Sequence, residues 1–202
     1  MSDLALTLLA YLIGSVPTGV VVGRLVGIDV RAVGSGNIGA TNVTRAAGNT
    51  AGFVTLIADV GKGAAAVALA RAFGTSEISV PAAVLAAPIG HIFSVFLRFS
   101  GGKGVATGLG SCLVLAPAAT IPSVLVFAAT CAVTRIVSVA SLAGAWTIPI
   151  SMFLADRDLP SVVAVTILAM VITVRHRDNI RRIRARIEPR FGDRPSPPEA
   201  GT

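Results

Sequence analysis

Residues 4–26 read LALTLLAYLIGSVPTGVVVGRLV, an apolar stretch long enough to cross a lipid bilayer as a helix. Similar stretches follow along the chain, separated by short polar segments. They cover 53–72, 79–97, 105–119, 120–134, 138–155 and 160–175. The sequence therefore predicts an all-α, polytopic membrane protein of about seven transmembrane helices.

The composition excludes a water-soluble globule and a disordered chain. Hydrophobic residues make up 53% of the 202 residues, and mean hydropathy is +0.80. Charged residues make up only 13%, whereas a soluble domain has roughly a quarter. We expect one integral membrane domain over residues 1–194, followed by a disordered tail at 195–202 whose apolar content is too low to order.

The distribution of charge predicts the orientation in the membrane. The chain has 17 Lys and Arg against 10 Asp and Glu, and so a net charge of +7. With seven spans and the N-terminus outside, only Arg71 and Arg157 of the 17 basic residues lie outside. This asymmetry favours two separate spans at 105–119 and 120–134 over one long kinked helix. An anionic substrate is a second explanation for the positive charge.

Other partner and cofactor classes receive no support from the sequence. The basic residues are spread among apolar spans rather than gathered on one soluble face, which disfavours nucleic acid as a partner. Cys112 and Cys131 lie in apolar stretches without a CxxC motif, so we expect no disulfide and no metal site. No cofactor is expected, and the oligomeric state is left open.

The first polar cluster is GSGNIGATNVTRAAG at residues 34–48. Gly34, Gly36 and Gly39 allow a positive φ and can expose consecutive backbone N–H groups, an arrangement that binds anions. Arg45 adds a forked donor suited to phosphate or carboxylate. An ordinary flexible loop between two spans is the alternative interpretation. The short hydrogen-bonding side chains of this segment are Ser35, Asn37, Thr41 and Asn42.

The second cluster is FSGGKGVATGLG at residues 99–110. Gly101, Gly102 and Gly104 surround Lys103 just before a span, where backbone amides near a helix N-terminus attract negative charge. The segment is not a Walker A motif, because GxxxxGK[ST] is absent. The alternative is a glycine-rich turn that carries one positive-inside lysine.

Two smaller clusters lie in or near the inner ends of later spans. Arg135, Ser138 and Ser141 follow at i, i+3 and i+6, which places them on one broad helix face for substrate contact or for helix packing. His176 and Asn179 are i, i+3 neighbours in a basic segment that we expect to extend the last helix. A neutral imidazole there can position or accept a proton, whereas the arginines around it suit a membrane surface.

Further charged residues fall inside spans. Asp59 and Lys62 form a pair that is either structural or a brace for the loops. His91 lies within the third span, about two turns from its inner end, either as a packing residue or as a functional one. Apart from His91, the polar clusters fall at the inner membrane surface, which suggests one site that binds more than one phosphate.

Five segments of the chain occur together in one order and spacing. They are GSVPTG (14–19), GSGNIGATNVTR (34–45), GHIF with FLRFSGGKGVAT (90–107), RIVSVAS (135–141) and HRDNIRRI (176–183). Together they resemble the bacterial integral-membrane acyl-phosphate:glycerol-3-phosphate acyltransferase family, over residues 4 to about 190.

The resemblance implies a multi-pass protein of the cell membrane with the N-terminus outside, the C-terminus cytoplasmic and the site at the cytoplasmic face. It implies transfer of a fatty acyl group from acyl-phosphate to the 1-hydroxyl of glycerol 3-phosphate. The products would be lysophosphatidic acid and phosphate, in the first step of phospholipid synthesis. The two substrates and the membrane lipids would be the partners of the chain.

The resemblance also implies roles for particular residues. The catalytic residues would be Ser35, Arg45, Lys103, Ser141, His176 and Asn179. Substrate and phosphate binding would involve Gly34, Gly36, Asn37, Thr41, Asn42, Gly101, Gly102 and Gly104. Glu188 would be structural. Arg186 stands where the family has a glycine, so the geometry of the segment around Glu188 is left open.

An acyl-phosphate is already activated, so we expect direct transfer without an acyl-enzyme. Lys103 and Arg45 would hold phosphates, Ser35 a phosphate or the developing oxyanion, and His176 with Asn179 the glycerol hydroxyl. A transporter is the main rival, but it predicts mid-membrane polar groups and an internal repeat, whereas the polar groups here lie mostly at the ends of the spans and no repeat is found. A purely structural subunit predicts no clustered glycine, lysine and arginine loops.

Overall fold

The computed structural model describes residues 2–192, and within them the regular structure is helical throughout, as predicted. The predicted disordered segment 195–202 lies outside the described residues. The helices are α1 (Asp3–Ser15), α2 (Thr18–Leu25), α3 (Ala40–Phe73), α4 (Ser79–Ile92), α5 (Val105–Leu115), α6 (Pro117–Thr134), α7 (Val137–Leu154), α8 (Leu159–Arg175) and α9 (Arg177–Arg184), with a 3-10 turn η1 (Val95–Leu97).

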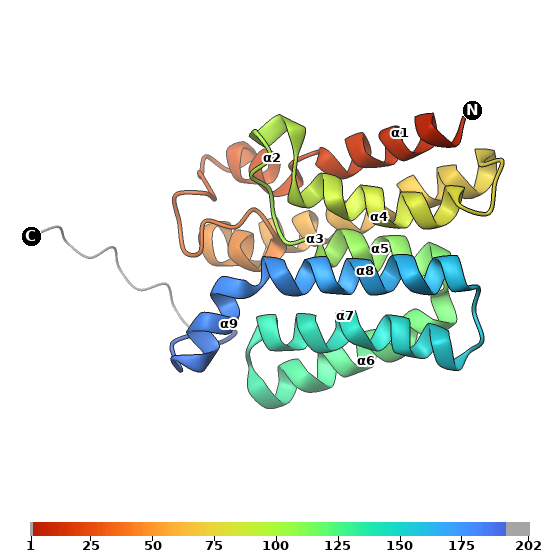
Figure 1. Cartoon of the computed structure of the whole chain (residues 1–202). Coiled ribbons are helices and arrows are strands. Elements are labelled where there is room, and N and C mark those ends of the chain that lie inside the picture. Colours follow the sequence, from red (N-terminus) through yellow and green to blue (C-terminus); the bar gives the residue numbers. More distant parts are fainter. Residues whose placement is uncertain (1, 193–202) are drawn as a thin grey trace, which may run out of the picture.

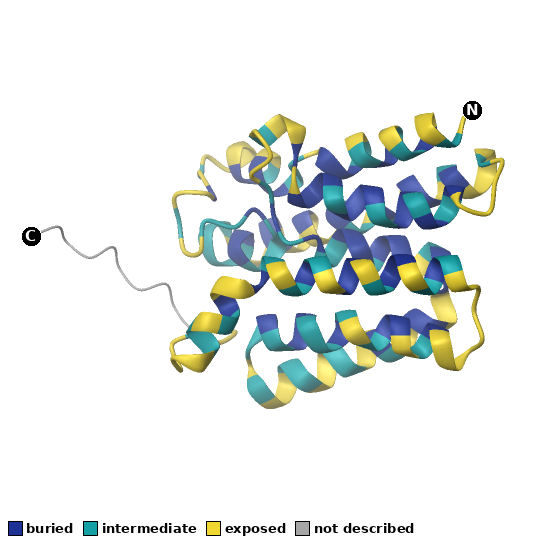
Figure 2. Cartoon of the chain, viewed as in Figure 1, coloured by how far each residue is buried: buried dark blue, intermediate teal, exposed yellow. Residues whose placement is uncertain are grey.

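The long helices run back and forth along one direction, and their ends gather at two ends of the bundle (Figure 1). α1 packs against α4, α3 against α5, and α6 against α7. Figure 2 shows buried residues on the faces that the helices turn toward one another and exposed residues along the outer faces. On α6 the exposed residues are large and apolar, among them Ile121, Leu125 and Val133. Such an outer surface suits contact with lipid tails.

Five helical segments are long and apolar enough to cross a membrane, judged by length and composition within residues 2–192. The pair α8 and α9, bent by 55° relative to each other, is a sixth candidate. Helix α5 has 11 residues. At about 1.5 Å per residue it is shorter than a hydrocarbon core of about 30 Å. The structure thus supports a multi-pass protein with one unusually short apolar helix.

The two runs expected at 105–119 and 120–134 do form separate helices, but the junction lies earlier than predicted. Ala116 breaks the helix with φ −148°, and Pro117 occupies the first turn of α6. A proline fits there because the first N–H groups of a helix have no intrahelical partner. Hydropathy did not locate this boundary, since both sides of it are apolar.

Residues 27–52, between the first two predicted spans, were expected to be a loop at the inner membrane surface, and this is partly wrong because α3 begins at Ala40 and not near residue 53. Polar residues in this segment lowered its hydropathy without preventing helical hydrogen bonding. Gly48 interrupts the helix with φ 87° and ψ 172°. The segment before Gly48 is thus a short helix that lies between the loop and the long apolar part of α3.

The third apolar run also ends earlier than expected. Helix α4 stops at Ile92, and the chain then turns through η1 to Arg98 and Phe99, which have φ values of 52° and 61°. His91 therefore lies in the last turn of α4 rather than two turns inside a span. This position places it beside the loop that carries Lys103.

The break between α1 and α2 is stabilised by a buried ion pair. The chain breaks at Pro17, and the Val16 carbonyl there accepts the Thr18 N–H at 3.0 Å in place of a helical i→i+4 hydrogen bond. Lys62 Nζ lies 2.9 Å from that oxygen and 2.8 Å from Asp59 Oδ1. Both side chains are buried, so each charge depends on the other.

We expect replacement of Asp59 by alanine to destabilise the protein by about 3–5 kcal/mol, because it leaves the Lys62 ammonium without its carboxylate in a buried site. Thermal unfolding in detergent measures the effect. Asp178→Ala is the matched control, since the Asp178 side chain is 59% exposed, and it should change stability by no more than about 0.5 kcal/mol. Equal unfolding temperatures for the two variants would contradict the expectation.

Candidate functional site

One cavity of about 1340 Å³ brings most of the predicted site residues together. Its wall comes from the segments before α3 and α5, from α3, α5, α6, α7 and α8, from His91 at the end of α4, and from the chain around α9. All six predicted catalytic residues line it: Ser35, Arg45, Lys103, Ser141, His176 and Asn179. So do Gly34, Asn37, Thr41, Asn42, Gly104 and Glu188. Three predicted binding glycines, Gly36, Gly101 and Gly102, are not part of the wall.

Asn42 organises the first glycine-rich segment. Its Nδ2 donates to the carbonyl oxygens of Val30 (2.8 Å) and Val33 (3.1 Å). Its Oδ1 accepts from the backbone N–H of Ser35 (2.9 Å) and from the Ser35 hydroxyl (3.2 Å). Since Asn42 is 2% exposed, it shapes the loop more than it faces the cavity. The Ser35 amide is therefore already occupied.

The glycines of this segment have two different roles. Gly34 and Gly36 adopt positive φ values of 61° and 65°, as predicted. Gly39 does not, because φ there is −76° and the residue precedes α3 in extended conformation. Its N–H donates to Asn37 Oδ1 at 2.8 Å, so the expectation of consecutive free amides is wrong at this position.

The second glycine-rich segment is built for close packing rather than for free amides. The N–H of Gly101 donates to the Ile92 carbonyl, and that of Gly102 donates to the His91 carbonyl, each at 3.0 Å. A Cβ atom at either glycine would lie 2.1 Å from an atom of His91, so neither position has room for a side chain. The two amides are thus not available as phosphate donors. Gly104, with φ 80°, starts α5, whose first N–H groups lie near the cavity.

Lys103, Asn179 and Glu188 form a chain of hydrogen bonds. Lys103 Nζ donates to Asn179 Oδ1, and Asn179 Nδ2 donates to Glu188 Oε1, both at 2.5 Å. The Ser138 hydroxyl adds a bond to Glu188 Oε1 (2.8 Å), and Arg182 Nε adds one to Glu188 Oε2 (2.6 Å). The carboxylate thus fixes the Asn179 amide, which in turn directs the Lys103 ammonium. This contact supports the structural role expected for Glu188.

The environment shifts the pKa of both charged ends of this chain. Burial lowers the pKa of Lys103 from 10.5 to about 8, although the negative charge of Glu188 opposes the shift. Burial raises the pKa of Glu188, but the hydrogen bonds from Asn179, Ser138 and Arg182 outweigh it and keep the pKa below 4.5. At neutral pH Glu188 is therefore ionised and most of the Lys103 population is protonated.

The chain turns at Arg186, after the end of α9, before it reaches Glu188. Arg186 adopts a left-handed φ of 59°, although it is not a glycine. The N–H groups of Arg186 and Ile187 donate to the carbonyls of Ile183 (3.0 Å) and Arg182 (2.9 Å), which close the end of α9. The question that Arg186 raised about the geometry of this segment is thereby answered, because the turn forms without a glycine.

His176 lies at the bend between α8 and α9, whereas Asn179 lies on α9. His176 Nδ1 is 2.8 Å from the Ile172 carbonyl oxygen. Because a carbonyl only accepts, Nδ1 carries a proton, and in the neutral ring Nε2 keeps its lone pair. His176 is among the largest fully buried side chains yet reaches the cavity wall, so it can orient one substrate group there.

The expected helix face of Arg135, Ser138 and Ser141 is partly wrong. Arg135 follows the end of α6 with a left-handed φ of 57°, before α7 begins. Its Nη2 donates to the Phe191 carbonyl at 2.9 Å, which attaches the segment after α9. Ser138 and Ser141 do share α7, and both line the cavity.

The rest of the cavity is apolar, and the sequence did not predict which residues line it. Hydrophobic side chains from α5 to α8 line it, and they are indistinguishable in the sequence from other residues of these runs. Examples are Leu109, Phe127, Ile148, Val165 and Leu168. The cavity can therefore hold an amphiphile whose anionic group lies beside Lys103 and Arg45. Among residues 2–192, no group of three or more His, Cys, Asp or Glu could hold a metal ion, and the metal-free site stays a prediction.

Comparisons with known proteins identify the family. The model of the glycerol-3-phosphate acyltransferase family matches residues 4–186. The glycerol-3-phosphate acyltransferase of Geobacter sulfurreducens is 43% identical over 192 residues, which are 95% of this chain and 98% of that protein. The enzyme of the same name from Jannaschia sp. is 50% identical over 187 residues, with 92% of this chain and 91% of that protein covered.

Solved structures agree with these matches. PlsY (YgiH), an integral membrane glycerol 3-phosphate acyltransferase, is similar in its glycerol 3-phosphate form with a TM-score of 0.90 at 38% identity, over 94% of this chain and 96% of that chain. In its lysophosphatidic acid form the TM-score is 0.88 at 37% identity, over 94% and 95%. The chain therefore belongs to the glycerol-3-phosphate acyltransferase family and is a multi-pass membrane enzyme of that class.

Proposed function

We propose that the protein transfers a fatty acyl group from acyl-phosphate to the 1-hydroxyl of glycerol 3-phosphate. The products are lysophosphatidic acid and inorganic phosphate, in the first step of phospholipid synthesis. The observation that carries this proposal is a single cavity with a cationic end and an apolar interior. The similarity of this chain to PlsY, which was solved in a glycerol 3-phosphate form and a lysophosphatidic acid form, supports the same acceptor and the same product here.

The charges of the cavity wall suit two phosphate-bearing substrates. Arg45, Lys103 and other basic groups near α9 reach the wall, whereas the wall carboxylates Asp59 and Glu188 already bind Lys62 and Arg182. Cations that face a water-poor site compensate for the mutual repulsion of two phosphates. We assign Lys103 and Arg45 to bind the two phosphate groups.

In the proposed reaction the 1-hydroxyl oxygen attacks the acyl carbonyl carbon, and the bond from that carbon to the phosphate oxygen breaks. The electron pair leaves with the phosphate, and the hydroxyl proton passes to a substrate phosphate or to His176. The carbonyl carbon is already activated, so no protein nucleophile is required. Alignment of the two substrates can supply about 7–11 kcal/mol of the barrier reduction.

Several side chains keep groups for this alignment. Ser35 lies at the wall, and its hydroxyl, which donates to Asn42 Oδ1 in this structure, would turn to donate to a substrate phosphate or to the developing oxyanion. Asn179 uses one N–H and its oxygen to hold Glu188 and Lys103, and keeps a second N–H for the substrate. His176 presents Nε2 to the glycerol hydroxyl. The remaining predicted site residues Gly34, Asn37, Thr41, Gly104 and Ser141 complete the polar wall.

The acyl chain of the donor would lie in the apolar part of the cavity between α5, α7 and α8. Side chains such as Leu109 and Leu168 line this part. Each methylene group that leaves water contributes about 0.8 kcal/mol. The acyl carbonyl of the donor would then lie at the border between the apolar interior and the cationic end of the cavity.

We also propose seven crossings, with α5 as a short fourth span, the N-terminus outside and the site at the cytoplasmic face. In Figure 1 the segment before α3, the turn between α6 and α7, and α9 lie at one end of the bundle. The N-terminus and the loop between α7 and α8 lie at the other. The first of these ends carries most of the basic residues, as expected for a cytoplasmic side.

An assay with two substrates tests the reaction. Purified protein supplied with palmitoyl-phosphate should release phosphate only when glycerol 3-phosphate is added, and mass spectrometry should identify lysophosphatidic acid. Lys103→Met should lower kcat/KM by roughly a hundredfold, because it removes a charge-assisted contact to phosphate. A covalently acylated protein would overturn direct transfer. Uptake of glycerol 3-phosphate into vesicles without any lipid product would favour a transporter.

The pH dependence of kcat/KM provides a second test. Because the pKa of Lys103 is lowered to about 8, the ammonium is present below that pH and is lost above it. We therefore expect kcat/KM to fall as pH rises through about 8. Lys103→Arg keeps its charge and should retain activity to higher pH, even if its overall rate is lower. The same alkaline midpoint in both proteins would show that another group causes the decline.

Accessibility labelling tests the orientation. Cys112 and Cys131 are first replaced by alanine, and single cysteines are then introduced at the exposed positions Glu77 and Arg177. An impermeant thiol reagent should label position 77 in intact cells, and position 177 only after the membrane is opened. Labelling of both positions from outside would contradict the proposed crossings.

A further inference from the structure

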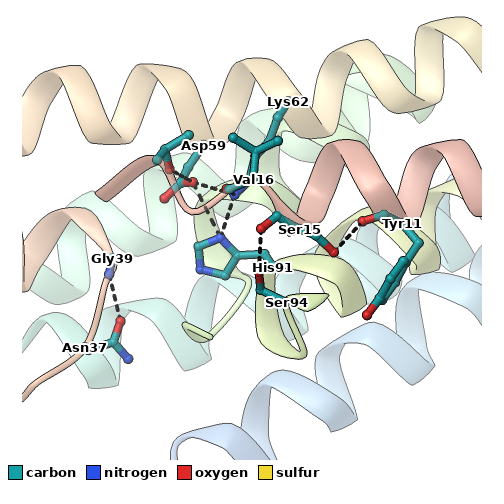
Figure 3. Close-up of polar contacts among 10 residues, drawn as sticks. Tyr11, Ser15, Val16, Asn37, Gly39, Asp59, Lys62, His91 and Ser94 are labelled. Carbon is teal, nitrogen blue, oxygen red and sulfur yellow. Dashed lines mark hydrogen bonds and ion pairs between the residues drawn. The ribbon is translucent and has the colours of Figure 1, made fainter. Parts of the chain in front are cut away.

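The buried cluster of Asp59, Lys62 and His91 is not explained by the proposed reaction. The three side chains are 1%, 8% and 4% exposed, and they connect α3 to the end of α4 (Figure 3). Thr18, at the start of α2, donates its hydroxyl proton to Asp59. Polar side chains within an apolar bundle are costly unless they are paired, so such a cluster calls for a function.

The cluster fixes both the orientation and the tautomer of the His91 ring. The Lys62 ammonium has three N–H groups and meets three acceptors: Asp59 Oδ1 at 2.8 Å, the Val16 carbonyl at 2.9 Å and His91 Nδ1 at 2.9 Å. Nδ1 also lies 3.4 Å from Asp59 Oδ1, but the ammonium is nearer and can only donate, so beside a charged Lys62 Nδ1 accepts and the proton of the neutral ring is on Nε2. Figure 3 shows Nε2 on the side of the ring away from Lys62.

The opposite side of the ring lies against the loop that carries Lys103. A Cβ atom at Gly102 would lie 2.1 Å from His91 Nε2, so the ring packs directly on the Gly102 backbone. The His91 carbonyl accepts the Gly102 N–H at 3.0 Å, and the Ile92 carbonyl accepts the Gly101 N–H at the same distance. His91 therefore contacts this loop through its ring and through its backbone.

Arg175 holds the same loop from the side of α8. Its Nη2 lies 3.4 Å from the Gly101 carbonyl oxygen and 3.3 Å from that of Gly102. Its guanidinium carbon lies 5.8 Å from the centre of the Phe93 ring. The two glycines are thus fixed between α4 and α8, and the next residue is Lys103.

We infer that His91 is a positioning residue for Lys103. The Asp59–Lys62 pair fixes the imidazole, the imidazole and the His91 carbonyl fix Gly102, and Gly102 sets the direction in which Lys103 enters the cavity. His91 is not one of the residues expected to be catalytic. Only its kinetic test rests on the proposed function.

Labelling of the Lys103 amine tests the inference without any acyl transfer. The purified protein is treated with a small amine-reactive reagent over a range of pH, and modification of Lys103 is quantified by mass spectrometry. In the wild-type protein the midpoint should lie near the lowered pKa of about 8. The charged neighbours of Lys103, namely Glu188, Arg182, Arg45 and Arg175, and the titratable ring of His176 are the same in every variant, so a shift reports the position of Lys103.

His91→Asn keeps an acceptor for Lys62 and removes most of the ring from Gly102. We expect the Lys103 midpoint to rise toward 10.5, because the side chain then relaxes into a more solvated position. Ser94→Ala is the matched control. Ser94 is fully buried two residues after the end of α4, and its hydroxyl donates to the Ser15 carbonyl at 2.5 Å rather than to the loop. Its midpoint should remain near 8.

In the acyl-transfer assay, His91→Asn should raise KM for a phosphate-bearing substrate about tenfold and change kcat less, because binding by Lys103 is weakened. Gly102→Ala is the second variant, and it keeps the side chains of Asp59, Lys62 and His91. Its methyl group meets the His91 ring, so the Lys103 midpoint should rise here too, even if His91→Asn does not fold.

A folded His91→Asn or Gly102→Ala protein with the wild-type labelling midpoint would overturn the inference. If labelling shifts but the wild-type protein makes no lysophosphatidic acid, the proposed function fails and the positioning role of His91 stands. If the wild-type protein is active but labelling does not shift in the variants, the proposed function stands and the positioning role of His91 fails.

Discussion

The hydrogen bond from Lys103 to Asn179 connects the two halves of the site. Lys103 precedes α5 and Asn179 lies on α9, so this contact joins segments that are 76 residues apart. Glu188 holds the other end of the Asn179 amide, and Ser138 and Arg182 hold Glu188. Because these groups are already oriented, little free energy is needed to reorganise them during the reaction. It also explains why a carboxylate belongs in a site for anions.

Buried charge is the second constraint on this protein. In an apolar bundle an ammonium must find acceptors inside the chain, and Lys62 finds three, one of which is the Val16 carbonyl at the kink after α1. The same cluster reaches the glycine loop through His91. The same set of contacts therefore stabilises the break between α1 and α2 and, through His91, positions Lys103.

The glycines show how a motif can be identified correctly and explained incorrectly. Their presence marked both loops, and Gly34, Gly36 and Gly104 do adopt positive φ. The amides of Gly101 and Gly102, however, bind carbonyl oxygens of α4. A sequence motif shows that a side chain is absent. It does not show whether the free space admits a ligand or another part of the chain.

The sequence alone determined the helical class, the membrane environment and most of the polar residues that line the cavity, because hydropathy and motif order are properties of the chain itself. It did not locate the start of α3 at Ala40 or the junction at Ala116, since hydropathy does not report hydrogen bonding. It also missed the place of His91 beside Gly102 and the apolar interior of the cavity. These depend on which helices pack together, and only the tertiary structure decided that, because residues distant in sequence meet through packing.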